Sequence, residues 1–238
     1  MRELIRDPIV TSNLPHKYLG MFGMIWITFL LVTIFTSLKT FDIFGFTFVA
    51  VAIGYPVTYI FSDIFTEVYG YRVSRKIIWS GFLCIAIGTS VAYLYTLIPP
   101  SQYFGSIENN SFNLIFRASP LIAFATILGF WLGELTNSFI LAKLKLFTKG
   151  KKEWLRYILS TFFGQLVDNT VGVTTIVLRS HLFSQKEGFS IVVTTVIFCT
   201  VWEMIASPIT HPIIRFIKKK EGIDTYDVGT KFNPFVFK

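Results

Sequence analysis

Acidic and amide side chains stand inside four otherwise apolar stretches of the chain. They are Asp63 and Glu67 in YPVTYIFSDIFTEVYGYR, Glu134 in GFWLGELTNSFI, Asp168 with Gln165 and Asn169 in GQLVDNTVG, and Glu203 in VWEMIASPITHP. An ionised side chain at the centre of a membrane helix costs about 2.5–3.5 kcal/mol on insertion scales, so each needs a partner, a cavity or a function. These residues are therefore the candidates for binding a polar solute.

Their spacing places them on helix faces. One stripe recurs every four residues, at Tyr59, Asp63, Glu67 and Tyr71, and a second combines Gln165, Asp168 and Asn169 at intervals of three and four. Pro56, about two turns before Asp63, interrupts the backbone hydrogen bonds of a helix, which membrane helices tolerate where they line protein or a cavity. We expect the two stripes to face each other across one cavity.

Structural roles remain open for most of these residues. Asp63 and Glu67 could instead pair with Arg72 or Arg75 at the end of their helix. Asp168 is the strongest candidate for the site, because it lies well inside an apolar stretch and no basic residue stands between 157 and 178.

The two remaining acids are less decisive. Glu134 follows Gly129 and Gly133, a spacing that lets helices approach closely, so it could simply pack there. Glu203, beside Trp202, is equally open between a binding and a structural role.

The elements that must position these residues are membrane helices. Of 238 residues, 53% are hydrophobic and 15% charged, and the mean hydropathy is +0.59, whereas soluble domains are about 25% charged. Six stretches are long enough to span, which takes about 20 apolar residues. They are 18–37, 43–61, 77–98, 118–141, 154–178 and 189–213. The sequence predicts an all-α membrane protein with one six-helix domain, 1–217, and a polar tail, 218–238, partly disordered.

The charge distribution predicts the orientation. Most of the 22 Lys and Arg residues lie before the first span, between the second and third, between the fourth and fifth, and after the sixth. Cytoplasmic loops retain Lys and Arg, so both termini should be cytoplasmic. Three spans per half are compatible with a 3+3 inverted repeat. The net charge of +8 comes from these clusters and not from one basic face, so no nucleic-acid partner is expected.

Other kinds of chemistry find little support. The three histidines are far apart in the sequence, and neither a phosphate-binding loop nor a nucleophile elbow is present. Asp63 and Glu67 alone offer too few oxygens for a divalent metal. Cys84 and Cys199 lie inside apolar stretches, where we expect buried thiols and not a disulfide. We therefore expect no catalytic residue, metal or cofactor.

Two stretches bear a family resemblance. At SDIFTEVYGYRVSRKIIWSGF, residues 62–82, and STFFGQLVDNTVGV, residues 160–173, the chain resembles the queuosine precursor transporter family, also called the vitamin uptake transporter family. The resemblance implies import of 7-deazaguanine precursors of queuosine, such as 7-cyano-7-deazaguanine or its aminomethyl relative, through the bacterial inner membrane. Gly164 stands where Ser would be expected, so the substrate could differ within the family.

The candidate residues suit such a base. A carboxylate accepts the adjacent N–H donors of a guanine-like edge, amides serve its carbonyl and ring nitrogen, and an aromatic ring stacks on its plane. Asp168 with Gln165 and Asn169, or Asp63 with Glu67, would supply the polar groups, and Tyr59, Tyr71 or Trp202 the ring. The expected partners are this small molecule and membrane lipid, with oligomerisation left open.

Two other classes remain as alternatives. One is the substrate-binding subunit of an energy-coupling vitamin uptake complex. Such subunits usually carry AxxxA contacts in their first span, and the stretch 18–37 contains no Ala, which counts against this class. The other is a membrane-embedded enzyme that modifies lipids.

Overall fold

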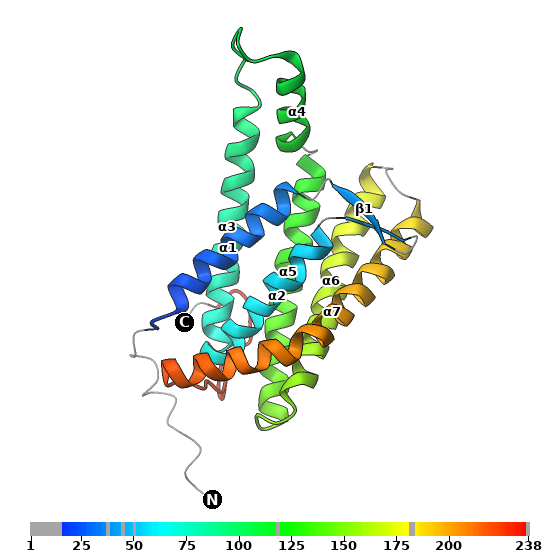
Figure 1. The fold of residues 1–238 in the computed structure, drawn as a ribbon. Helices are drawn as coiled ribbons and strands as arrows, with labels where there is room; N and C mark the ends of the chain where they lie inside the picture. The colour runs from blue at the N-terminus through cyan, green and yellow to red at the C-terminus, as the bar shows by residue number, and fades with distance from the viewer. Residues whose placement is uncertain are drawn as a thin grey trace, which may run out of the picture.

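Helices form most of the structure (Figure 1). The computed structural model describes residues 16–36, 39–43, 46–49, 51–117, 120–180 and 184–236. In chain order its helices are α1 (Leu19–Phe35), α2 (Val51–Ile64), the π-helical turn η2 (Phe65–Tyr69), α3 (Tyr71–Tyr95), α4 (Ser106–Phe116), α5 (Pro120–Phe147), α6 (Glu153–Ser180) and α7 (Gln185–Glu221). Each of the six predicted spans thus overlaps a helix.

A short β-hairpin precedes α2. Strand β1 (Thr40–Ile43) pairs antiparallel with β2 (Phe46–Val49), with Thr40 opposite Val49 and Ile43 opposite Phe46. The helix expected from residue 43 therefore begins only at Val51. The two segments TFDI and FTFV are rich in β-branched and aromatic residues, which favour strands. Their apolar character alone would fit a helix equally well.

The second predicted span ends in a π-helical turn. Helix α2 continues through Pro56 into η2, all five residues of which are buried. Gly70, with φ of 85°, ends this turn and begins α3. A π-turn leaves backbone carbonyls displaced from the α-helical pattern. Here Lys145 Nζ donates to the carbonyl of Glu67 at 2.7 Å, and the amide of Thr225 donates to that of Val68 at 3.3 Å.

Helices α5 and α6 pack closely because glycines face each other. A Cβ on Gly133 would lie 2.9 Å from the carbonyl oxygen of Gly164, and one on Gly164 would lie 3.0 Å from that of Gly133. A Cβ on Gly129 would likewise lie 2.6 Å from the carbonyl oxygen of Asp168. Small residues allow this approach of helix backbones inside membranes.

Among the residues that the structure describes, three helices are long and apolar enough to cross a membrane, namely Tyr71–Tyr95, the Phe124–Phe147 part of α5, and Gln185–Glu221. Helix α1 is apolar but has only 17 residues. Many large apolar side chains on α3 and α7 are exposed, as expected for surfaces that face lipid. A membrane protein is thus indicated, while six spans, cytoplasmic termini and an inverted repeat stay predictions.

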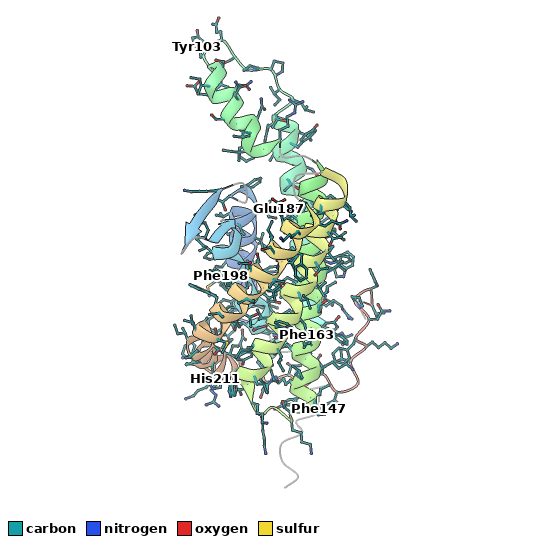
Figure 2. The ribbon with its side chains drawn as sticks, turned by 90° about the vertical axis from the view of Figure 1, so that its right-hand side faces the viewer. Tyr103, Phe147, Phe163, Glu187, Phe198 and His211 are labelled. Carbon is teal, nitrogen blue, oxygen red and sulfur yellow. The ribbon has the colours of Figure 1, made fainter. Side chains whose placement is uncertain are left out.

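The segment between the third and fourth predicted spans, residues 99–117, contains α4. In both views α4 projects beyond the bundle (Figures 1 and 2), and Tyr103, in the segment before α4, lies at this far end (Figure 2). Phe147 and His211 lie toward the opposite end of the bundle, and Glu187 lies between the two ends, nearer to α4 (Figure 2).

The C-terminal segment packs on the helices. Residues 218–221 complete α7, which ends at Gly222 with φ of 69°, and the following residues run along α3. Tyr71 NH donates to Asp227 Oδ2 at 2.9 Å, and Trp79 Nε1 donates to the carbonyl of Pro234 at 2.9 Å. Over residues 222–236 this segment lies against α3 and α5, where Phe232 and Phe235 contact aromatic side chains, and partial disorder of the tail stays a prediction.

Candidate functional site

Four acidic side chains from four helices are buried in one region of the bundle. Asp63 comes from α2, Glu134 from α5, Asp168 from α6 and Glu203 from α7, and none is more than 5% exposed. Electrostatic interactions link Asp63 to both Glu203 and Glu134, and Glu134 to Asp168. Cys199, one turn before Glu203, interacts with Asp168 and Glu203. We call the four acidic residues the acidic centre.

Amide side chains accompany these carboxyl groups. Asn137 on α5 donates from Nδ2 to Asp63 Oδ1 at 2.9 Å. Gln165 on α6 accepts at Oε1 from Asn169 Nδ2 at 3.0 Å, and its main-chain oxygen accepts from the same group at 2.9 Å. Because an amide has both donors and an acceptor, the region offers both kinds of hydrogen-bonding group to a solute.

Many buried polar atoms here have no hydrogen-bond partner among the residues that the structure describes. They are Asp63 Oδ2, both carboxyl oxygens of Glu134, Asn137 Oδ1, Gln165 Nε2, Asp168 Oδ2 and both carboxyl oxygens of Glu203. The Ser62 hydroxyl interacts with Glu134 but does not reach hydrogen-bond geometry. Buried polar groups without partners cost about 1–3 kcal/mol each and are rare, so this concentration makes the region the candidate binding site.

Tyr59 reaches the acidic centre from α2 at the crossing of α5 and α6. A Cβ on Gly133 would lie 2.7 Å from the Tyr59 hydroxyl and 2.6 Å from Asp168 Cβ. A Cβ on Gly164 would lie 2.8 Å from Tyr59 Cε1. The two glycines therefore make room for the Tyr59 ring beside Asp168.

Glu67 lies at the centre of a second cluster. Its Oε1 accepts from Lys218 Nζ at 2.7 Å and from Arg156 at 2.9 Å, and lies 3.3 Å from Lys145 Nζ. Glu67 is fully buried, and Lys145 and Arg156 are at most 2% exposed. We call Lys145, Arg156 and Lys218 the cationic clamp. Since they come from α5, α6 and α7, one carboxylate of η2 ties three helices together at the Phe147 end of the bundle (Figure 2).

Asp224, in the segment after α7, joins the cationic clamp from outside. Its Oδ1 accepts from Lys145 Nζ at 2.7 Å and lies 2.9 Å from Lys218 Nζ. Burial raises the pKa of the Asp224 carboxyl, but the ammonium groups of Lys145 and Lys218 outweigh this effect and hold it below its ordinary value.

The predicted stripe of α2 divides between these two clusters. Tyr59 and Asp168 meet at the α5–α6 crossing, as the shared cavity requires, while Asp63 bonds to Asn137 of α5. Glu67 contacts the cationic clamp and lies away from this pair. The π-turn between these positions contributes to the division, because it changes the direction in which side chains project.

The alternative ion pairs of Asp63 or Glu67 with Arg72 or Arg75 are not formed among the residues that the structure describes. The ion pairs of Glu67 use other cations, and Arg75 instead donates to the carbonyl of Lys231 at 2.9 Å and to that of Asn233. Trp202 is 40% exposed on α7, so its ring is not enclosed with the acidic centre.

Sequence reasoning missed the partners of these carboxylates. Asn137 follows Glu134 by three residues and so shares its helix face, a signal that was available. Lys145, Arg156 and Lys218 were read as loop charges only, since nothing in their local sequence distinguishes a buried cation from an exposed one.

Comparison with known proteins identifies the family. The sequence model of the family described as "Putative vitamin uptake transporter" matches residues 49–213. The chain belongs to this family. The resemblance seen in the two sequence stretches is thereby confirmed, and the protein is a transporter and not an enzyme. The matched range contains the whole acidic centre together with Glu67, Lys145 and Arg156.

This transporter is also similar to a curated protein. It is 27% identical over 161 residues to the "Probable queuosine precursor transporter" of Bacillus subtilis (strain 168), which covers 66% of this chain and 69% of that protein. No solved structure matches the chain.

Proposed function

We propose that this protein imports a queuosine precursor, a base of the 7-cyano- or 7-aminomethyl-7-deazaguanine type, across the bacterial cytoplasmic membrane. Membership of the vitamin uptake transporter family and the name of the Bacillus subtilis relative support this assignment. The apolar helices and the asymmetric distribution of Lys and Arg support a multi-pass protein with six spans and cytoplasmic termini.

The observation that supports the substrate class best is a pair of polar atoms on α6 that have no hydrogen-bond partner in the described part of the chain. Asp168 Oδ2 is a buried acceptor and Gln165 Nε2 a buried donor, three residues apart and therefore on one helix face. A guanine-like edge presents N–H donors next to a carbonyl acceptor, so it would complement both atoms. The Tyr59 ring, beside Asp168 at Gly133, is placed to contact the plane of the base.

Uptake by the purified protein tests this proposal. Liposomes that contain only this protein should take up labelled 7-cyano-7-deazaguanine, and excess unlabelled guanine-like base should compete. Import that needs an added ATPase would instead support the subunit of an energy-coupling complex. No uptake of either deazaguanine in a reconstituted, folded protein would refute the proposed substrate class.

The variant Asp168→Asn examines the role of the carboxylate. It keeps the shape of the side chain but replaces an oxygen acceptor by a donor, which mismatches an N–H edge. A hydrogen bond to a charged group contributes about 1.5–3 kcal/mol, so the apparent affinity for the base should fall roughly 10- to 100-fold. Glu108→Gln, an exposed acid on α4, is the matched control and should transport normally. Unchanged affinity in Asp168→Asn would remove this residue from the site.

A further inference from the structure

The acidic centre contains more carboxyl groups than the proposed base requires. The substrate edge described above uses Asp168 and Gln165. Asp63, Glu134 and Glu203 remain, from three different helices, and each is fully buried. Five of their six carboxyl oxygens have no hydrogen-bond partner in the described part of the chain. These three groups therefore need an explanation other than contact with the base.

The charges around these groups disfavour three simultaneous carboxylates. Asp63 interacts with Glu203, Glu134 and Glu67, all acidic, and its one recorded hydrogen bond comes from the neutral amide of Asn137. Glu134 interacts with Asp168, and Glu203 with Cys199.

The nearby cations are already engaged. Lys145, Arg156 and Lys218 surround Glu67, one turn further along the same stripe as Asp63. Burying like charges without counter-ions is unfavourable, so carboxyl groups in this position bind a cation or a proton.

A proton fits better than a metal ion. Among the residues that the structure describes, no group of three or more His, Cys, Asp or Glu side chains has the geometry to hold a metal. Sodium and other hard cations need several oxygens directed at one point. A carboxyl group that accepts a proton becomes a neutral donor, and Asn137 Oδ1, a buried acceptor without a partner, stands beside Asp63 to receive such a hydrogen bond.

We propose that Asp63, Glu134 and Glu203 form a proton-binding site and that this protein imports its substrate together with protons. The inference rests on the proposed transport function. In each cycle a carboxylate takes up a proton from the outer side, forming one O–H bond, and releases the same proton to the cytoplasm, so the chemistry balances without a redox partner.

The proposed proton-binding site interacts with both the substrate edge and the acid that the cationic clamp surrounds. Glu134 interacts with Asp168, so protonation on α5 changes the charge felt at the substrate edge. Asp63 interacts with Glu67, which holds α5, α6 and α7 together through the cationic clamp. Protonation of the acidic centre therefore bears on both the substrate edge and the cationic clamp.

Proteoliposomes with an imposed pH gradient test the coupling. With the interior one pH unit more alkaline, one proton carried per neutral base predicts about tenfold accumulation of labelled 7-cyano-7-deazaguanine at the plateau. A pH-sensitive dye inside weakly buffered vesicles should report acidification when the base is added outside. Both readings use the wild-type protein and do not depend on the folding of a variant.

Counterflow, the exchange of labelled for unlabelled base without any gradient, separates the two proposals. If counterflow fails in the wild-type protein, the transport function itself is wrong. If counterflow occurs but the pH gradient produces no accumulation, the proton site is refuted, and accumulation driven by a sodium gradient instead would equally refute it.

Variants test which residues bind the transported proton. Asp63→Asn and Glu203→Gln should reduce the plateau accumulation ratio from about ten to about one, whatever their transport rate, because a plateau measures coupling and not speed. Glu108→Gln should keep the full ratio. Full ratios in both test variants would exclude these residues as the proton-binding groups.

Discussion

Replacing Glu67 by Gln should destabilise the protein more than any exposed acid does. The substitution keeps the size of the side chain but removes the negative charge that Lys145, Arg156 and Lys218 share. Two of these cations are at most 2% exposed, so water cannot replace the lost partner.

The magnitude follows from the geometry of the cationic clamp. Removing one partner of a buried ion pair typically costs about 3–5 kcal/mol. Asp224 still neutralises Lys145 and Lys218 after the change, and Arg156 keeps its bond to the carbonyl of Lys151 at 2.6 Å, so the lower end applies. For a chain of this length about 3 kcal/mol corresponds to a fall in Tm of roughly 6–12 °C.

Thermal unfolding of the detergent-purified protein, followed by the loss of the monodisperse chromatographic peak, measures this shift. Glu108→Gln, which removes an exposed carboxylate from α4, is the matched control and should change the Tm by no more than about 1 °C. Equal Tm values for Glu67→Gln and the control would refute the reasoning, since they would show that the cationic clamp contributes no net stability.

Three further changes probe other parts of the structure. Gly133→Val should abolish uptake and reduce the monodisperse chromatographic peak, because its Cβ alone would lie 2.6 Å from Asp168 Cβ, whereas Gly20→Val, with nothing within 4 Å, should be tolerated in both assays. Single cysteines placed in 99–117 should react with an impermeant thiol reagent added outside intact cells and those in 143–153 should not; the reverse pattern would invert the proposed orientation. The pKa of Asp224 is lowered, so its ion pairs stabilise the fold above its ordinary value of 3.8 and are lost as the pH falls below it. Asp224→Asn should therefore lower the Tm at pH 7, by less than Glu67→Gln because Asp224 is half exposed, and the difference should shrink as the pH falls below 3.8.

Hydropathy and helical spacing identified the helices and the polar residues inside them. Asp168 and Gln165 stand on one face of α6 because residues three apart always do, whatever the rest of the fold. The family resemblance added the substrate class, which no periodic pattern could supply.

The ion-pair partners of the buried acids could not be predicted from the sequence in the same way. Whether Glu67 meets Arg72 or Lys218 depends on how α2 and α7 cross, and the two residues of the actual pair are 151 positions apart. The π-turn at Phe65–Tyr69 also has no local sequence signal, yet it separates the surroundings of Asp63 from those of Glu67. The hairpin before α2 was missed because a short apolar run fits either a strand or a helix.

The cationic clamp has a consequence for biosynthesis. Glu67 emerges from the ribosome before all three of its cations, with Lys145, Arg156 and Lys218 following 78, 89 and 151 residues later. At about 5–20 residues per second, the last of them is made roughly 8–30 s after Glu67. Until Lys145 is made the new η2 segment contains an uncompensated acid, and the full set of ion pairs around Glu67 must wait for α7. The ion pairs that close the bundle are thus completed only near the end of translation, and a chain that stops before Lys218 leaves Glu67 without the cation from α7.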